Sequence, residues 1–252
     1  MCEKATNKLV LFGAGKIGRS FIAPLFNQGG YEVVFIDINK PLIDELNRKH
    51  NYNLVIKSYE NKIINIQNVR GVNGTDEGKV MEEIKSASII AISVGLRGLE
   101  SIIPVIADGL IARYQSVNAS LLDIIIAENL RDASGFIKGE LKKYLPKEYP
   151  IDERIDLIET SIGKMVPIMT EKDVQEDILQ VFAEPYNTLI LDKLAFKNPI
   201  PEIEGLAPKD NIKAWVDRKL FIHNLGHVTA AYLGFVGIRI RFIYMKFLLT
   251  RN

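Results

Sequence analysis

Three polar residues near the C-terminal end have types and a spacing that could do chemistry. Lys219, Asn224 and His227 lie within one nine-residue segment, KLFIHNLGH. On an α-helix their side chains fall at about 0°, 140° and 80° around the axis, so all three can face one cavity. A lysine amine, an amide and an imidazole together suit a reaction in which a hydroxyl loses its proton and negative charge builds on its oxygen. The segment therefore indicates alcohol oxidation without a metal ion.

Two other interpretations fit the same spacing. The first is an amphipathic helix with a surface lysine, an exposed asparagine and a half-buried histidine. The second is a metal site, since His223 and His227 are four residues apart, but the only other histidine is His50 and no acidic cluster stands nearby. A catalytic Lys219 must lose its proton near neutral pH, although the pKa of free lysine is about 10.4. Burial would lower that pKa.

A glycine-rich segment near the N-terminus, GAGKIG, follows the apolar run KLVLF and opens a predicted helix. In such a strand–turn–helix unit the first glycine permits a tight turn, the second lets the backbone approach a pyrophosphate, and the third allows close helix packing. The helix N-terminus supplies free N–H groups for phosphate oxygens. We therefore predict a dinucleotide site in this segment. Its candidate residues are Gly13, Ala14, Gly15, Lys16, Ile17, Gly18 and Arg19.

Asp37 ends the second predicted strand, YEVVFID, where a carboxylate can accept hydrogen bonds from the adenosine ribose hydroxyls. That carboxylate would repel a 2′-phosphate, so NAD is favoured over NADP, and the nearby Lys40 weakens this preference. Arg19 could add a positive charge for the pyrophosphate, or it could be a solvated arginine on the first helix. A plain strand–turn–helix without a ligand is the alternative for the whole unit.

The order of the remaining segments predicts an α/β fold with a Rossmann-type, doubly wound sheet. Two alternating segments flank the tripeptide Tyr-Glu-Asn and predict an inserted hairpin. The predicted sheet strands are 8–12, 31–37, 88–94 and 121–127, and further strand-like runs are 156–166 and 179–191. The predicted helices are 16–28, 41–49, 99–114 and 129–144. The arms of the predicted hairpin are 53–58 and 62–69. Three prolines within ten residues, Pro199, Pro201 and Pro208, mark the best linker. We therefore expect a dinucleotide-binding domain over 1–194 and a second domain over 195–252.

Composition excludes several classes of protein. The chain has 252 residues, of which 47% are hydrophobic, enough for one large or two ordinary domains. Its 32 basic and 31 acidic residues give no reason to expect a nucleic-acid or membrane surface. The single cysteine, Cys2, allows no internal disulfide, and the N-terminal residues lack an apolar signal region, so we expect a cytoplasmic protein. Charged residues, among them Arg239, interrupt the apolar C-terminal stretch and argue against a membrane span.

Taken together, these residues resemble the polyol-specific long-chain dehydrogenases, the mannitol dehydrogenase family. The resemblance runs from the N-terminus to about Gly234. The segments that carry it are LFGAGKIGR (11–19), AENL (127–130), MVP (165–167), DK (192–193) with Phe196, Pro201 with GL (205–206), VDRKLF (216–221), Asn224, GH (226–227) and AYLG (231–234).

The resemblance implies NAD-dependent, reversible interconversion of D-mannitol 1-phosphate and D-fructose 6-phosphate. It also implies a Rossmann-type domain followed by a mainly helical domain. Lys219 would be the general acid and base, and Asn224 and His227 would stabilise the alkoxide. Asn129 matches an asparagine near the nicotinamide in that family, and a hydrogen-bonded loop residue is its alternative. A dehydrogenase of free polyols or hexuronates, and an NAD-binding fragment without turnover, are the competing functions.

Members of this family continue with further helices, whereas this chain ends at Asn252. Its last residues, 236–252 (VGIRIRFIYMKFLLTRN), match nothing in the family and show no clear amphipathic period. We therefore expect a frameshift or a truncation after Gly234 or Phe235, with a genuine short form as the alternative. Either event would leave a partial helical domain that exposes apolar surface.

Overall fold

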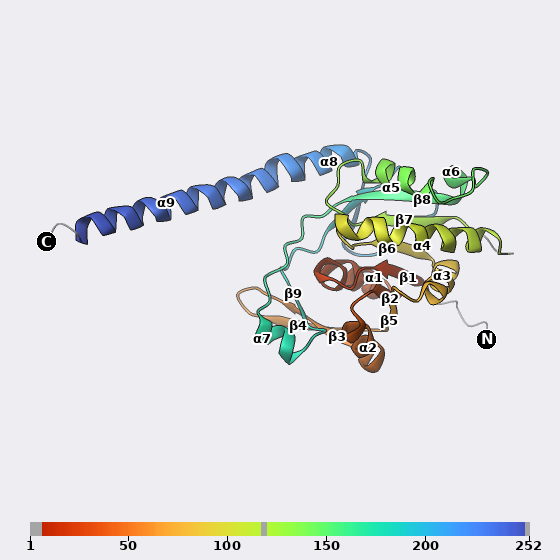
Figure 1. The fold of residues 1–252 in the computed structure, drawn as a ribbon, viewed down its shortest axis with the longest axis horizontal. Helices are drawn as coiled ribbons and strands as arrows, with labels where there is room; N and C mark the ends of the chain where they lie inside the picture. The colour runs from red at the N-terminus through yellow and green to blue at the C-terminus, as the bar shows by residue number, and fades with distance from the viewer. Residues whose placement is uncertain (1–6, 117–119, 250–252) are drawn as a thin grey trace. The chain divides into compact units, whose positions relative to one another are not determined.

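The computed structural model describes residues 7–116 and 120–249 (Figure 1). The chain divides into two compact units, Met1–Ile212 and Lys213–Asn252. The first unit is built on a large sheet with helices on both faces, which confirms the predicted Rossmann-type α/β fold. The second unit is helical.

Eight strands form the main sheet. Their spatial order is β11 (Leu206–Lys209), β10 (Leu189–Asp192), β8 (Ile155–Ser161), β7 (Leu122–Ile126), β6 (Ile89–Ile92), β1 (Lys8–Phe12), β2 (Glu32–Asp37) and β5 (Val69–Asn73). All neighbours are parallel except β10, which runs antiparallel to β8. The central strands consist mainly of Val, Ile, Leu and Phe because both faces are buried.

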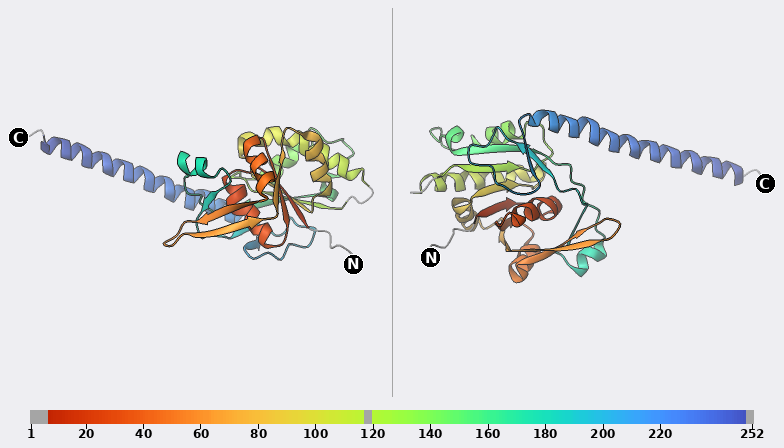
Figure 2. Two further views of the ribbon diagram at one scale, coloured as in Figure 1. Left: turned by 90° about the horizontal axis from the view of Figure 1, so that it is seen from below. Right: turned by 180° about the vertical axis from the view of Figure 1, so that it is seen from behind.

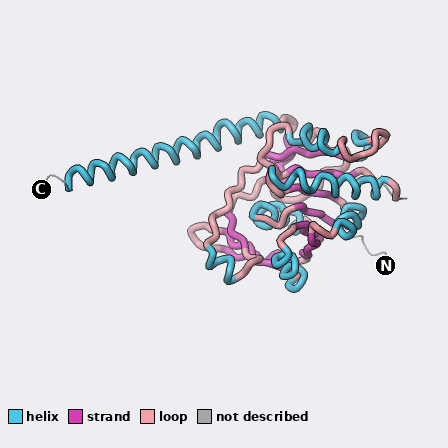
Figure 3. The backbone as a smooth tube through the Cα atoms, viewed as in Figure 1, coloured by secondary structure: helices cyan, strands magenta, loops and turns pink. Residues whose placement is uncertain are grey.

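Helices cover both faces of this sheet, as the two views of Figure 2 and the helices of Figure 3 show. Successive strand residues point to opposite faces, so Leu9 and Leu11 join one core and Val10 and Phe12 join the other. The first core takes its helical residues from η1 (Gly18–Ile22), α1 (Ala23–Gln28) and α2 (Lys40–Lys49). The second takes them from α3 (Glu77–Ser86), α4 (Leu96–Tyr114) and α5 (Ala133–Leu141). The short helices are α6 (Ile151–Arg154) and α7 (Glu171–Glu176).

The inserted hairpin is confirmed as β3 (Asn51–Ile56) and β4 (Lys62–Gln67), which pair antiparallel. A third strand, β9 (Val181–Ala183), adds to β3 and completes a separate small sheet. The second predicted arm extended to Val69, which instead begins β5 of the main sheet. The predicted run 179–191 is divided between the two sheets, because β9 pairs with β3 while β10 pairs with β8.

The division between the units falls later than the sequence predicted. We expected the first domain to end at residue 194, whereas the first unit extends to Ile212. The reason is β11, which pairs with β10 over Leu206–Lys209 and so belongs to the main sheet. The second unit holds α8 (Ile212–Arg218) from its second residue onwards, η2 (Lys219–Asn224) and α9 (Leu225–Leu249). None of the helices in the described residues is long and apolar enough to cross a membrane.

At one edge of the main sheet, a side chain forms hydrogen bonds with the backbone of the edge strand. The amide of Asn47, from α2, donates through Nδ2 to the carbonyl of Gly71 at 2.9 Å and accepts from the Gly71 N–H through Oδ1 at 2.8 Å. Gly71 lies in the edge strand β5. A Cβ at this glycine would come within 2.7 Å of the Ile43 side chain, so glycine lets α2 approach the strand closely.

Two carboxyl groups are buried side by side near the start of β7 and β8. Asp123 and Asp156 are register partners with exposed fractions of 2% and 3%. Asn198 Nδ2 donates to Asp123 Oδ1 at 3.1 Å, and Lys197 Nζ lies 2.7 Å from Asp156 Oδ1. Burial, with a further contribution from the Asp156 charge, raises the pKa of Asp123 to about 6.

Asp123→Asn should stabilise the protein at neutral and basic pH. The folded-state pKa of about 6 exceeds the reference value of 3.8, so the wild type loses stability as pH rises between these values and stays lower above them. The amide carries no charge and should raise the free energy of unfolding at pH 8 by up to about 3 kcal/mol, with a smaller gain near pH 4.5. Urea unfolding over this pH range measures the gain. The exposed Asp108→Asn is the control, and a pH-independent gain would contradict the prediction.

Candidate dinucleotide and catalytic sites

Of the three glycines in the glycine loop, only Gly15 has room for an added Cβ. Gly13 has φ +100°, and a Cβ there would lie 2.2 Å from the Ser93 carbonyl oxygen. A Cβ at Gly18 would lie 2.2 Å from the Gly13 carbonyl oxygen. At Gly15 a Cβ would meet nothing within 4 Å. The first and third glycines are therefore required by the fold itself, and the space at the second fits the backbone approach of a pyrophosphate.

The chain leaves the loop through a π-helical turn. η1 begins at Gly18, and α1 continues the same helical segment from Ala23. Lys16 is exposed before this turn, while Ile17 packs partly against the first core. Turns of this kind recur at functional sites, and the start of the segment provides the backbone N–H groups that bind phosphate at helix N-termini.

Arg19 is buried beneath the loop, with 8% of its surface exposed. Its Nε donates to the Ala14 carbonyl at 2.7 Å, and its Nη1 donates to the carbonyls of Ile178 at 2.9 Å and Leu179 at 2.6 Å. Burial lowers the pKa of this guanidinium. The interpretation of Arg19 as a solvated residue is therefore wrong. Its hydrogen bonds tie the glycine loop to the segment before β9.

Asp37 holds the glycine loop from the neighbouring strand. Its Oδ2 accepts a hydrogen bond from the Ala14 N–H at 2.7 Å, and its Oδ1 accepts from the Asn39 N–H at 2.9 Å. The residue is half-buried at the end of β2. A carboxylate has about four acceptor positions, so two remain for hydroxyl donors.

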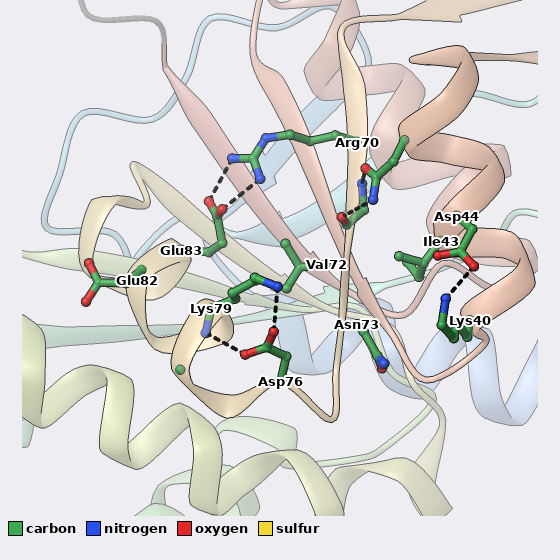
Figure 4. A pocket seen from close by; sticks show the side chains of 13 residues that line it. Lys40, Ile43, Asp44, Arg70, Val72, Asn73, Asp76, Lys79, Glu82 and Glu83 are labelled. Atoms are coloured by element: carbon green, nitrogen blue, oxygen red, sulfur yellow. Dashed lines mark hydrogen bonds and ion pairs between the residues drawn. The ribbon is translucent and has the colours of Figure 1, made fainter.

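The cations that line a groove between α2, β5 and α3 are paired with carboxylates (Figure 4). The groove has a volume of about 650 Å³. Lys40 Nζ lies 2.6 Å from Asp44 Oδ2, and Lys79 Nζ lies 2.7 Å from Asp76 Oδ2. Lys40 therefore has a carboxylate partner of its own, which reduces its capacity to offset the charge of Asp37 towards a 2′-phosphate.

Two polar residues, Glu128 and Asn129, lie just past the end of β7, and sequence analysis singled out only Asn129. Asn129 is exposed, as a residue that meets a ligand must be. Glu128 is buried, and its Oε1 accepts hydrogen bonds from the N–H groups of Val94 at 2.7 Å and Gly95 at 2.8 Å. Burial raises the pKa of Glu128, and the two N–H groups oppose that shift. The available signal was an acidic residue placed directly between a buried strand and the asparagine.

The second unit carries Lys219, Asn224 and His227, but not on a regular α-helix. Lys219–Asn224 forms the π-helical turn η2, and His227 lies in the first turns of α9. Hydrogen bonding from i to i+5 brings Lys219 and Asn224 closer together around the axis than the roughly 140° by which an α-helix would separate them. Lys219 and Asn224 are half-buried and His227 is exposed. Burial lowers the pKa of Lys219, the direction that acid–base chemistry requires.

The alternative metal site has two candidate ligands among the described residues, His223 and His227. His223 and His227 are both exposed on the helical segment. Within residues 7–116 and 120–249, no three His, Cys, Asp or Glu side chains gather in a way that could hold a metal ion. A zinc site needs three or four protein ligands.

A second lysine with a lowered pKa was not singled out from the sequence. Lys164 follows β8, and burial lowers its pKa to about 8. Its Nζ donates to the carbonyls of Glu184 at 2.9 Å and Tyr186 at 2.5 Å. These bonds join two loop segments, so we assign Lys164 a structural role.

Comparison with known proteins identifies the family. The model of the mannitol dehydrogenase Rossmann domain matches residues 7–205. The chain is 34% identical over 228 residues to a mannitol-1-phosphate 5-dehydrogenase from Lactiplantibacillus plantarum, a match that covers 89% of this chain and 58% of that protein. The chain therefore spans less than two thirds of the length of this relative.

Solved structures share the fold. Mannitol 2-dehydrogenase from Pseudomonas fluorescens, in a ternary complex with NAD and D-mannitol, gives a TM-score of 0.71 at 12% identity, over 86% of this chain and 55% of that one. A PanE/ApbA family ketopantoate reductase from Ralstonia eutropha gives a TM-score of 0.51 at 13% identity, over 84% and 60%. Residues 7–205 of this chain match the family model, so the chain belongs to the mannitol dehydrogenase family.

Proposed function

We propose that this chain binds NAD at the Gly13–Gly18 loop and interconverts D-mannitol 1-phosphate and D-fructose 6-phosphate. The observation that carries the proposal is the glycine loop, which has open space at Gly15 between two glycines that cannot accept a Cβ. Membership of the mannitol dehydrogenase family supports the reaction type. The phosphorylated substrate is supported by 34% identity to a mannitol-1-phosphate 5-dehydrogenase, and NAD by the bound cofactor of the mannitol 2-dehydrogenase structure.

The residues of the first unit fit such a cofactor. The open space at Gly15 and the backbone N–H groups at the start of the helical segment, which begins at Lys16, suit the pyrophosphate. Asp37 has acceptor positions left for the adenosine ribose hydroxyls. Asn129, exposed past the end of β7, is the proposed neighbour of the nicotinamide. When bound, NAD supplies the acceptor for the hydride that leaves the carbinol carbon.

The residues of the second unit would handle the proton. In oxidation, Lys219 Nζ takes the proton of the substrate hydroxyl, and in reduction it returns a proton to the ketone oxygen. Its pKa is lowered by burial, so more of the neutral amine is present near pH 7 than in a free lysine. Asn224 and His227 donate hydrogen bonds to the oxygen as negative charge develops on it.

A second candidate follows from the length of the match. The chain covers 58% of its mannitol-1-phosphate 5-dehydrogenase relative, and groups that bind the sugar phosphate could lie in the part that is not covered. An NAD-binding protein without turnover is therefore the alternative. It predicts a normal NADH affinity together with an inactive protein.

The deciding experiment follows NADH consumption with fructose 6-phosphate, fructose, fructuronate and tagaturonate in parallel. Turnover with fructose 6-phosphate alone supports the proposal, and turnover with another of these ketoses moves the substrate to free polyols or hexuronates. Lys219→Ala should reduce turnover by at least about a hundredfold and leave the NADH affinity within about twofold of wild type. Lys213→Ala, an exposed lysine of α8, is the matched control. An active Lys219→Ala variant would remove this residue from the mechanism.

Gly15→Ala should separate cofactor binding from folding. The added methyl meets no protein atom within 4 Å, so the melting temperature should stay within about 2 °C of wild type. The methyl occupies the space proposed for the pyrophosphate, so the NADH affinity should fall at least about tenfold. Gly13→Ala should instead lower the melting temperature, because its Cβ clashes with the Ser93 carbonyl and its φ is positive. Normal NADH binding by Gly15→Ala would place the cofactor elsewhere.

Asp37→Asn should relax the preference for NAD over NADP. The single amide oxygen can still accept the Ala14 N–H, so the glycine loop keeps its support, while the hydrogen bond from the Asn39 N–H and the charge that repels a 2′-phosphate are lost. We expect the preference for NADH over NADPH, expressed as the ratio of their affinities, to fall by about tenfold. Asp37→Ala, which also loses the loop contact, should weaken both cofactors. Fluorescence titration with NADH and NADPH measures both effects, and an unchanged ratio in both variants would refute the ribose role.

A further inference from the structure

Glu128 is a carboxylate that the chain has buried at a helix N-terminus. Its exposed fraction is 8%, and both hydrogen bonds to its Oε1 come from backbone N–H groups, those of Val94 and Gly95. Gly95 directly precedes the 19-residue helix α4. A carboxylate at this place is favoured by the two donors and by the helix dipole.

The loop that Glu128 holds, residues 93–95, lies against the glycine loop. The Ser93 N–H donates to the Phe12 carbonyl at 2.8 Å, and Ser93 is the residue that a Cβ on Gly13 would strike. These loops follow β6 and β1, which are neighbours, while β2 pairs with the other side of β1. The strand order reverses here, and open α/β sheets bind ligands outside the carboxyl ends of the strands at such a switch point.

The two helix N-termini at this switch point therefore differ. The one after the glycine loop has open space at Gly15. Before α4, the N–H groups of Val94 and of the N-cap residue Gly95 are bound to the carboxylate of Glu128. A phosphate group placed beside that carboxylate would meet a negative charge. The chain thus leaves the first helix start open to an anion and places a carboxylate at the second.

We propose that Glu128 is a positioning residue for the cofactor. Its carboxylate fixes the loop 93–95 against the glycine loop. The nicotinamide half of the cofactor would then lie along the loop 93–95, while the pyrophosphate would be held by the glycine loop itself. This inference rests on the proposed NAD binding. Glu128 acts through the loop and exchanges no proton with the substrate.

ADP and NADH distinguish this role from a purely structural one. ADP carries the adenosine and the pyrophosphate, which Asp37 and the glycine loop would hold, and it lacks the nicotinamide half. Loss of the positioning role should weaken NADH alone. Loss of a general structural contact should weaken both ligands and lower the melting temperature.

The experiment compares Glu128→Ala, Glu128→Gln and a matched control, Glu159→Ala. Glu159 is also buried, in β8. Its Oε1 accepts hydrogen bonds from the N–H of Ser134 at 3.1 Å and from the Oγ of Ser134 at 2.7 Å. Glu128→Ala should lose at least about tenfold in NADH affinity and less than about twofold in ADP affinity. Glu128→Gln keeps an oxygen acceptor and should bind NADH nearly as wild type does. Glu159→Ala should keep the wild-type ratio of the two affinities.

Amide hydrogen exchange reports on the loop without any cofactor. Exchange at Val94 and Gly95 should accelerate at least about tenfold in Glu128→Ala and stay near the wild-type rate in Glu128→Gln and Glu159→Ala. Parallel losses of NADH and ADP affinity, or unchanged exchange at these two amides, would overturn the inference. A wild type that binds ADP but no NADH would overturn the proposed function as well. A wild type that binds both, with Glu128→Ala unchanged, would overturn the inference alone.

Discussion

At the carboxyl ends of the parallel strands, one interaction recurs and holds the loops in place. In each case a carboxylate accepts hydrogen bonds from backbone N–H groups of an adjacent loop or helix start. Asp37 at the end of β2 holds the glycine loop after β1, Glu128 after β7 holds the loop after β6, and Glu159 in β8 holds the start of α5 after β7. Each loop leaves donors without partners as the chain turns from strand to helix. A charged acceptor binds such donors more strongly than a neutral one, and the loops keep a fixed shape. Gly15, where a Cβ would meet nothing within 4 Å, lies directly after Ala14, whose N–H is held by Asp37 in this way.

Local patterns were sufficient to predict much of this arrangement. The glycines, Asp37, the central strands and the hairpin follow from spacing and from hydrophobic runs, because each depends on residues close in sequence. β5 was missed because its sequence, VRGVN, places an arginine and a glycine in an edge strand directly after the hairpin. The buried position of Arg19 could not be predicted either, since two of its three acceptors lie about 160 residues away. Contacts between distant segments leave no periodic signal in the sequence.

The segment that carries Lys219, Asn224 and His227 shows a different limit. Its residue types were informative, but the predicted angles assumed a regular α-helix, and the chain forms a π-helical turn over Lys219–Asn224. One additional residue in a turn changes which side chains align along the axis. The candidate residues therefore stay the same while their relative placement changes, and the lysine and the asparagine come closer to one line than the α-helical spacing allows.

The Asn47–Gly71 pair has a consequence for association between molecules. An uncovered edge strand invites a strand from another molecule to add to the sheet, which is a route to aggregates. In β5 a single amide side chain makes the two hydrogen bonds that an incoming strand would otherwise make with Gly71. A second molecule would have to displace this amide before it could extend the sheet. The side chain therefore protects this edge against polymerisation, and no further strand is needed to cover it.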